Sequence, residues 1–405
     1  RQIACLTSVG VQIFAKMRPI DKLMDILLNS RHVDSTEMAA FFGTYGAEAC
    51  AMCLSLACSP DFSHYIKFSG SLIQQASMAY LSHYGNPSLL ESYRQDQWVG
   101  NQVLVNSPGH DGFALYLARI LRPMLSMSPF FYFSTTNTLQ NRYNSSQLTL
   151  LQLYLLKLKQ FLDTNQFAQI RGDEKETSVN VTNPEESKKR EQVSLSNLHQ
   201  VLLRAVEALS LLDIISRHDL SKIKAASTLL ARVSNLQFKD YVLVNERDVI
   251  RDLIEALTSA ISLDNQIEPL EAELRKRCPS FMTGSDGLRL KAIDALNKAR
   301  YAATQEDRKE MLKSSLKFYL QVAASISPNL KAICDDYRAM GYNAGAVSLA
   351  LACAKALDPK DVALKFFREG QPSTDEVGKH HFEMRMRCYY QVREVLSYVL
   401  TLPNI

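Results

Sequence analysis

The chain has 405 residues, of which 46% are hydrophobic and 22% charged, and its formal net charge is +4. It holds 15 glycines and 13 prolines, fewer than the roughly 7% and 5% of average usage, and this balance favours helices over strand-and-turn folds. Its basic residues are scattered, which excludes the concentrated positive surface of a direct nucleic-acid binder. The length suffices for several domains or for one elongated stack of helices.

The start of the chain reads as folded structure and not as a targeting segment. Because it begins at Arg1 and continues with closely spaced apolar residues, we expect a piece of a longer protein. No signal peptide is recognisable, so the eight cysteines are expected to be free thiols in a reducing compartment. The most apolar stretch, Leu115–Phe133, contains two arginines and two prolines and lacks the roughly 20 uninterrupted apolar residues of a membrane span. A soluble protein is therefore expected.

Residues 1–169 are predicted to form a first helical block with one long loop. Pro19 suits the first position of a helix, because its missing N–H would be unpaired there. Asp34 and Glu37 have the spacing of a capping box that opens the next helix. Residues 85–111 lose helical periodicity and predict the loop.

Apolar periodicity predicts four more helices in this block, over 47–58, 69–84, 113–125 and 146–167. Between the last two, residues 128–138 contain four consecutive aromatic residues and fit either a strand or an irregular packed turn.

Residues 170–193 carry many charged side chains and almost no large apolar ones. Such a segment cannot bury enough surface to offset the entropy lost on ordering. The sequence therefore predicts a disordered charged loop here, which separates the first block from a second.

Residues 194–405 are predicted to form a second block in which helices follow one another with short connections. Thr304 and Asp307 again have capping spacing, Ser327 precedes Pro328 as a helix start, and Gly341 marks a helix end. The last helix is predicted to begin near Ser373. About sixteen helices are expected over the whole chain.

These patterns together predict an all-α protein. Consecutive helices with short connections and no closing sheet favour antiparallel helix pairs stacked in a line. Since no fixed repeat length is present, the predicted architecture is an irregular α-helical solenoid.

Clusters of cysteine and histidine were weighed as metal sites. Cys50, Cys53 and Cys58 precede His64, but no matching second CxxC pair follows, so buried thiols are the favoured interpretation. His380 and His381 project about 100° apart on a helix and cannot converge on one ion. A solvated polar face, which includes nearby Glu383, is expected there.

Catalytic motifs are also missing from the sequence. The segment Gly109–Gly112 places His110 beside Asp111 between glycines, and we interpret it as a tight turn. No GxSxG elbow, Walker loop or GxGxxG accompanies it. No catalytic, cofactor-binding or metal-binding residue is predicted, no cofactor is expected, and no partner-binding residue can be assigned.

Several segments resemble the large inner-ring scaffold nucleoporin of the nuclear pore complex, the vertebrate one-hundred-fifty-five-kilodalton nucleoporin family. The residues that carry this resemblance are Lys16–Leu23, Tyr45–Cys58, Gly109–Arg119, Arg308–Lys317, Tyr337–Arg338 and Phe366–Pro372. The matches are spread over nearly the whole chain and none is a catalytic motif. Family members join an N-terminal β-propeller to a long α-solenoid, so the resemblance implies a fragment of the solenoid that follows the propeller.

The resemblance implies a non-enzymatic scaffold in the inner ring of the nuclear pore complex at the nuclear envelope, supporting nucleocytoplasmic transport. Implied partners are other inner-ring nucleoporins and flexible linker nucleoporins, which would lay apolar anchors into grooves between helices. Membrane contact would come only through parts of the family that this chain lacks. A vesicle-coat or tethering solenoid is the alternative, because coats use the same helical stacks. An enzyme with a site of dispersed residues is a third hypothesis.

Overall fold

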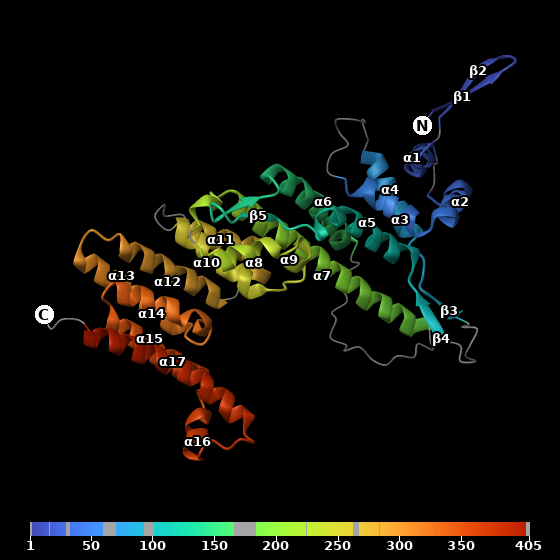
Figure 1. The fold of residues 1–405 in the computed structure, drawn as a ribbon. Helices are drawn as coiled ribbons and strands as arrows, with labels where there is room; N and C mark the ends of the chain where they lie inside the picture. Colours follow the sequence, from blue (N-terminus) through green and yellow to red (C-terminus); the bar gives the residue numbers. More distant parts are fainter. Residues whose placement is uncertain are drawn as a thin grey trace. The chain divides into compact units, whose positions relative to one another are not determined.

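The computed structural model describes residues 2–15, 17–29, 33–59, 70–92, 101–165, 184–223, 225–261, 267–282 and 284–401. Within these residues lie seventeen α-helices, and the strands form only two-stranded sheets (Figure 1). The chain divides into two compact units, which are described separately. Unit one comprises residues 1–129, 141–213 and 236–245, and unit two comprises residues 130–140, 214–235 and 246–405.

Unit one is a group of helices with two antiparallel hairpins. Its hairpins are β1 (Gln2–Thr7) with β2 (Gly10–Ala15), and β3 (Ser88–Ser92) with β4 (Asn101–Val105). Its helices are α1 (Pro19–Asn29), α2 (Thr36–Tyr45), α3 (Ala47–Ala57), α4 (Gly70–Ser82), α5 (Pro108–Leu125), α6 (Ser145–Thr164), most of α7 (Pro184–Ser216) and α9 (Phe238–Val242).

Helix α3 is the centre of unit one and packs against both α4 and α5. Its alanines and cysteines let neighbouring backbones approach closely, as their small size predicts. Gly112 of α5 lies at such an approach, because a Cβ atom there would meet the Cβ atom of Cys50 and lie only 2.8 Å from the carbonyl oxygen of Ala47. The prediction of a helix over 47–58 is confirmed.

Unit two combines one short hairpin with a series of consecutive helices. The hairpin is β5 (Phe130–Phe133) with β6 (Thr138–Asn141). The α-helices are α8 (Ser227–Asn235), α10 (Arg247–Ile261), α11 (Ile267–Arg277), α12 (Gly284–Arg300), α13 (Gln305–Gln321), α14 (Leu330–Ala339), α15 (Asn343–Leu357), α16 (Val362–Arg368) and α17 (Glu376–Thr401). The 3₁₀ segments are Leu220–Lys222, Pro279–Phe281 and Ser327–Asn329.

Neighbours along the chain pack side by side in unit two. Helix α12 lies against α13, α14 against α15, and α15 and α16 against α17, as the orange and red ribbons of Figure 1 show. One hydrophobic cluster runs through α12 to α15 and α17 and includes the fully buried Leu349 and the nearly buried Cys388. The Ser315 hydroxyl, which donates to the carbonyl of Ala292 at 2.9 Å, also ties α13 to α12.

The helix starts follow the sequence signals, with local corrections. Helix α1 begins at Pro19 as predicted. The cap of α2 is Ser35 and not Asp34, because the Ser35 side chain accepts from the backbone N–H of Met38. Thr304 caps α13 by accepting from Asp307 N–H at 3.0 Å, as predicted. Ser327 does not cap an α-helix, since the Ser327–Asn329 turn is 3₁₀ and α14 follows it.

The prediction of a long loop over residues 85–111 is wrong for most of that stretch. It contains the β3–β4 hairpin, and α5 already begins at Pro108, capped by Ser107. The Ser-Pro pair was a readable helix start. Gly109–Gly112 is thus the first turn of α5 and not a tight turn. Residues 128–138, left open between strand and irregular turn, hold β5 and the start of β6.

The prediction of disorder over 170–193 is wrong from residue 184 onward. Helix α7 begins at Pro184 with Glu185 and Glu186 in its first turn, where acidic side chains interact favourably with the helix dipole. Ser187 and Glu191 are buried, so tertiary contacts order a segment whose composition alone would not. Residues 170–183 lie outside the described part, and the predicted division into blocks stays a prediction.

No single helix in the described ranges is both long enough and apolar enough to cross a membrane. Helices α2 and α3 reach that length and apolarity only when taken together, and they are bent by 113° at their junction.

Candidate functional site

Helix α17 carries the surface of unit two that best fits a binding role, and local capping fixes where it begins. The Asp375 carboxylate accepts from the backbone N–H of Gly378 at 2.8 Å, which satisfies one of the unpaired donors of the first turn. The predicted start near Ser373 is therefore three residues early. From Glu376 the helix runs to Thr401.

One face of α17 packs against the hydrophobic core of unit two. The residues on this face are Gly378, His381, Arg385, Cys388, Val392 and Val395. They follow one another in steps of three or four residues, the spacing of one helix stripe. Cys388 and Val395 are 1% and 3% exposed and belong to the hydrophobic cluster with α15. This stripe explains why α17 packs where it does.

A buried carboxylate fixes the joint between α16 and α17. Asp358 accepts from the backbone N–H groups of Val362 and Ala363 at 2.8 and 2.9 Å and from Arg385 at 3.0 Å. Burial acts to raise the pKa of Asp358, but these hydrogen bonds outweigh it and lower the pKa below its ordinary value. The ionised carboxylate therefore caps α16 and holds α17 at the same time.

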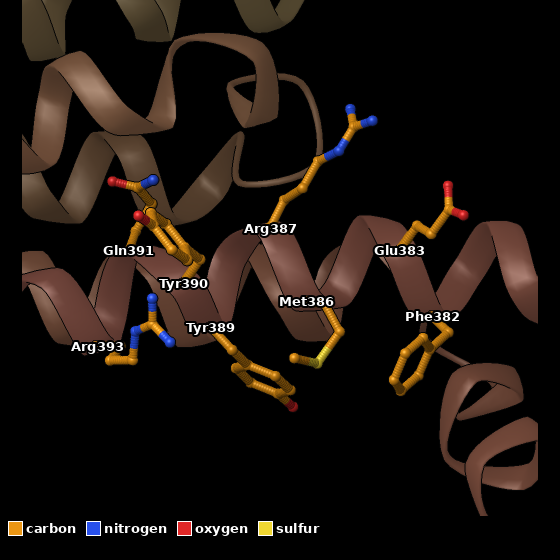
Figure 2. Close-up of a pocket in the computed structure, with 8 residues that line it drawn as sticks. All are labelled: Phe382, Glu383, Met386, Arg387, Tyr389, Tyr390, Gln391 and Arg393. Atoms are coloured by element: carbon orange, nitrogen blue, oxygen red, sulfur yellow. The ribbon is translucent and has the colours of Figure 1, made fainter.

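A second stripe on α17 is partly exposed, with Phe382 and Tyr389 half-buried and Tyr389 packed against the hydrophobic cluster of unit two. It consists of Phe382, Met386, Tyr389, Arg393, Leu396 and Leu400, in strict steps of four and three residues. Met386, Leu396 and Leu400 are 45%, 51% and 85% exposed. Figure 2 shows Phe382, Met386 and Tyr389 projecting from the same side of the helix. The ring of Phe367 on α16 stacks on Phe382 at 6.0 Å and extends the apolar surface.

An open groove includes four residues of this stripe (Figure 2). It is lined by eight residues of α17, namely Phe382, Glu383, Met386, Arg387, Tyr389, Tyr390, Gln391 and Arg393. All come from a single helix, so they cannot enclose a substrate. Arg393 makes no ion pair with any described residue, and its guanidinium carbon lies 4.7 Å from the centre of the Tyr390 ring. An apolar surface edged by arginine suits protein binding more than catalysis.

Sequence analysis missed this surface, although its signal was present. The alternating steps from Phe382 to Leu400 are a heptad pattern. The buried stripe has the same spacing, and the sequence does not say which of two stripes on one helix is covered. Only the packed structure separates them.

The cysteines and histidines weighed as metal ligands do not come together. Cys50, Cys53 and Cys58 are buried in unit one, and burial raises the pKa of the Cys50 and Cys58 thiols to about 12. No cluster of three or more possible ligands exists among the described residues. His64 lies outside them. The rings of His380 and His381 are inclined at 75°.

A buried polar network in unit one resembles the arrangement of a hydrolase triad. His110 Nδ1 lies 2.9 Å from Asp111 Oδ1, and His110 Nε2 lies 2.9 Å from Ser194 Oγ of α7. The Ser107 hydroxyl donates to Glu191 Oε1 at 2.8 Å in the same network. Sequence analysis had named His110 and Asp111 but not Ser194, which is distant in the chain.

This network holds α7 against the start of α5 and does not form an active site. Ser194 lies inside α7, where its backbone N–H belongs to the helix ladder and cannot stabilise an oxyanion. His110 is only 4% exposed, so a substrate cannot reach it. The hydrogen bond from Ser107 to the buried Glu191 carboxylate compensates for the hydration that this carboxylate loses on burial.

Comparisons with known proteins agree with the fold and with the resemblance in the sequence. A family model described as "Non-repetitive/WGA-negative nucleoporin C-terminal" matches residues 107–402. A probable nucleoporin of Schizosaccharomyces pombe is 27% identical over 97% of this chain and 32% of its own length. Nucleoporin NUP170 of Chaetomium thermophilum is 27% identical over 98% of this chain and 29% of its own.

A solved structure confirms the architecture. The crystal structure of Chaetomium thermophilum Nup170 SOL matches with a TM-score of 0.70 over 89% of this chain and 45% of that chain, at 23% identity. The prediction of an all-α solenoid is therefore confirmed. The chain spans about a third of the length of the curated relatives it matches. Because the family model covers most of it, the chain belongs to the family described as non-repetitive/WGA-negative nucleoporins.

Proposed function

We propose that this chain is a scaffold segment of the inner ring of the nuclear pore complex. In this function it binds flexible linker nucleoporins and other inner-ring proteins at the nuclear envelope and supports nucleocytoplasmic transport without catalysing a reaction. The observation that carries the proposal is the match of residues 107–402 to a nucleoporin family. The same match favours the pore over a vesicle coat or a tethering complex.

The physical basis of the proposal is the kind of surface that packed helices offer. Each helix pair buries one set of apolar stripes internally and can present others to a partner. The open groove on α17, with its aromatic rings and arginines, has the composition found at the centre of protein interfaces. An extended or helical segment of a linker nucleoporin would bury its apolar side chains on such a surface.

Two measurements on the 405-residue chain test the proposal. Calorimetric titration with segments of linker nucleoporins should give saturable binding, whereas scrambled versions of the same segments should give none. A fluorescently tagged chain should concentrate at the nuclear rim of cells. Absence of binding to every linker segment, together with a diffuse cellular signal, would overturn the proposal.

A further inference from the structure

Helix α7 buries different kinds of side chain at its two ends. Within residues 185–194, which we call the strap, the two buried side chains are Ser187 and Glu191, and the one aliphatic residue, Val193, is 39% exposed. From Leu195 onward the buried side chains of α7 are mostly aliphatic. The strap is therefore attached to unit one through polar groups, whereas the turns that follow are attached mainly through apolar ones.

The polar groups of the strap meet the start of α5. The backbone N–H and the hydroxyl of Ser107 both donate to the Glu191 carboxylate, and the Tyr84 hydroxyl donates to the same carboxylate at 3.5 Å. Nearer the middle of α7, Ser194 Oγ lies 2.9 Å from His110 Nε2. A helix start favours negative charge, because its N–H groups are unpaired and its dipole is positive there. Glu191 is thus the main attachment of the strap.

The surface that receives the strap is held together without it. The Gly109 N–H donates to the Tyr84 carbonyl at 2.8 Å, and the Tyr80 hydroxyl donates to the Gly109 carbonyl at 3.0 Å. The Tyr84 ring lies so close to Gly109 that a Cβ atom there would collide with it. These contacts include no residue of α7, so we expect the start of α5 to keep its structure when the strap leaves.

Detachment of the strap would expose little apolar surface. Because its buried side chains are polar, water can replace their hydrogen bonds. Opening the following turns of α7 would instead expose fully buried apolar residues such as Leu202 and Ala205. Segments with few buried apolar contacts open locally at a lower free energy than the whole protein. A detached strap would also lose its helical order, since tertiary packing supplies most of the stability of a helix.

We propose that the strap is a reversible order–disorder element, which closes on the start of α5 through Glu191 and opens while the rest of unit one stays folded. Opening uncovers Ser107 and His110, which are 0% and 4% exposed in the closed form. The inference goes beyond the proposed scaffold function and does not depend on it, because the strap and its receiving surface belong to one chain and no partner is involved.

Thiol labelling of the 405-residue chain tests the proposal. Ser187→Cys places a thiol in the strap, and Cys5→Ser removes an exposed native thiol. Mass spectrometry follows the reaction of each cysteine with a maleimide, and the fully buried Cys53 of α3 reports the unfolding of unit one as a whole. The thiol at position 187 should react at least roughly tenfold faster than Cys53, because local opening costs less free energy than global unfolding.

Leu155→Ala separates local opening from global unfolding. Leu155 is a fully buried residue of α6, and its truncation should speed the reaction of Cys53 at least roughly tenfold, because the cavity destabilises unit one. The rate at position 187 should stay unchanged, because unit one remains folded when the strap opens.

Glu191→Gln tests the attachment itself. Loss of the charge-assisted hydrogen bonds from Ser107 should speed labelling at position 187 by roughly tenfold. The matched control is Glu185→Gln, which removes the same charge from an exposed side chain in the first turn of α7 and should change the rate by less than about threefold. Circular dichroism of every variant checks that it remains folded.

Several results would overturn the proposal. Equal rates at position 187 and at Cys53, or equal acceleration of both by Leu155→Ala, would show that the strap opens only when unit one unfolds. An unchanged rate in Glu191→Gln would show that this carboxylate does not hold the strap. Labelling at position 187 as fast as labelling of the exposed Cys5 in the parent chain would show that the strap is not docked at all.

Discussion

Helices α3 and α17 lie in different units and show two opposite uses of an apolar helix. In α3, seven of the eleven residues are buried, and small side chains allow α4 and α5 to approach closely. In α17, three of the 26 residues are buried, and Met386, Leu396 and Leu400 of a second apolar stripe are exposed. Helix α3 buries most of its apolar surface inside unit one, whereas α17 leaves part of its apolar surface exposed.

This difference teaches that side-chain size, and not only apolar spacing, distinguishes an internal helix from one with a binding face. Alanine and cysteine offer little area to a partner but permit dense packing. Phenylalanine, methionine, tyrosine and leucine, which form the exposed stripe of α17, offer large area. If the comparison is right, mutations in the buried surface should mainly lower the free energy of unfolding. Mutations in the exposed surface should mainly weaken binding and leave the free energy of unfolding almost unchanged.

The largest expected difference in the free energy of unfolding is between two leucine-to-alanine substitutions in unit two. Leu349→Ala removes a fully buried side chain from α15 and should lower the free energy of unfolding by about 2–5 kcal/mol, because a cavity remains. Leu396→Ala, on the exposed stripe of α17, should change it by less than about 0.5 kcal/mol. Urea unfolding followed by circular dichroism measures both. A large loss for Leu396→Ala would mean that the stripe is part of the core.

A smaller effect is expected from overfilling the tight contact in unit one. Gly112→Ala places a methyl group against Ala47 and Cys50 of α3, with only 2.8 Å to the Ala47 carbonyl oxygen. Backbone atoms cannot swing aside as a flexible side chain can, so α3 and α5 must separate. We expect a loss of about 1–3 kcal/mol in the free energy of unfolding. Unchanged stability would show that the two helices pack less closely than described.

Local signals in the sequence predicted most helices but could not predict the ordering of residues 184–193. Pro19, Gly341 and Thr304 act at the positions and in the roles that their chemistry suggests. The start of α7 depends instead on Glu191, which is buried by contacts with Ser107 some 84 residues earlier in the chain. The composition of a segment contains no information about residues elsewhere in the chain, such as Ser107, that contact it in the folded protein.

The α17 surface was not predictable for a related reason. Both stripes of this helix have heptad spacing, so periodicity alone gives them equal weight. What decides between them is the position of α14, α15 and α16, which pack against α17 and bury Cys388 and Val395 of one stripe. The family resemblance, carried by segments such as Tyr45–Cys58, identified the lineage correctly but contained no information about which face remains free.

A further prediction concerns the joint that presents the exposed stripe. Asp358→Asn keeps the shape of the side chain but loses the charge that caps α16 and pairs with Arg385. We expect a loss of about 1–2 kcal/mol in the free energy of unfolding at pH 7, as for other helix caps. The measurement is the urea midpoint of both proteins.

The pH dependence of this effect follows from the lowered pKa of Asp358. A depressed pKa in the folded state means that the carboxylate stabilises the protein above its unfolded pKa, which is about 4. This contribution is lost as the pH falls through the folded pKa. The difference between wild type and Asp358→Asn should therefore shrink below about pH 4, and a difference that persists there would contradict the role of the charge.

The smallest expected effect is a stabilisation, and it serves as the counterpart of Gly112→Ala. Gly43 lies within the exposed part of α2, and a Cβ atom added there would meet nothing within 4 Å. Gly43→Ala should therefore raise the free energy of unfolding by about 0.4–1 kcal/mol, because alanine loses less backbone entropy in a helix. Glycine-to-alanine substitution is thus expected to raise the free energy of unfolding at Gly43 and to lower it at Gly112. A loss of stability at Gly43 would show that α2 has a neighbour on this side, and the comparison between covered and open helix faces would have to be redrawn for unit one.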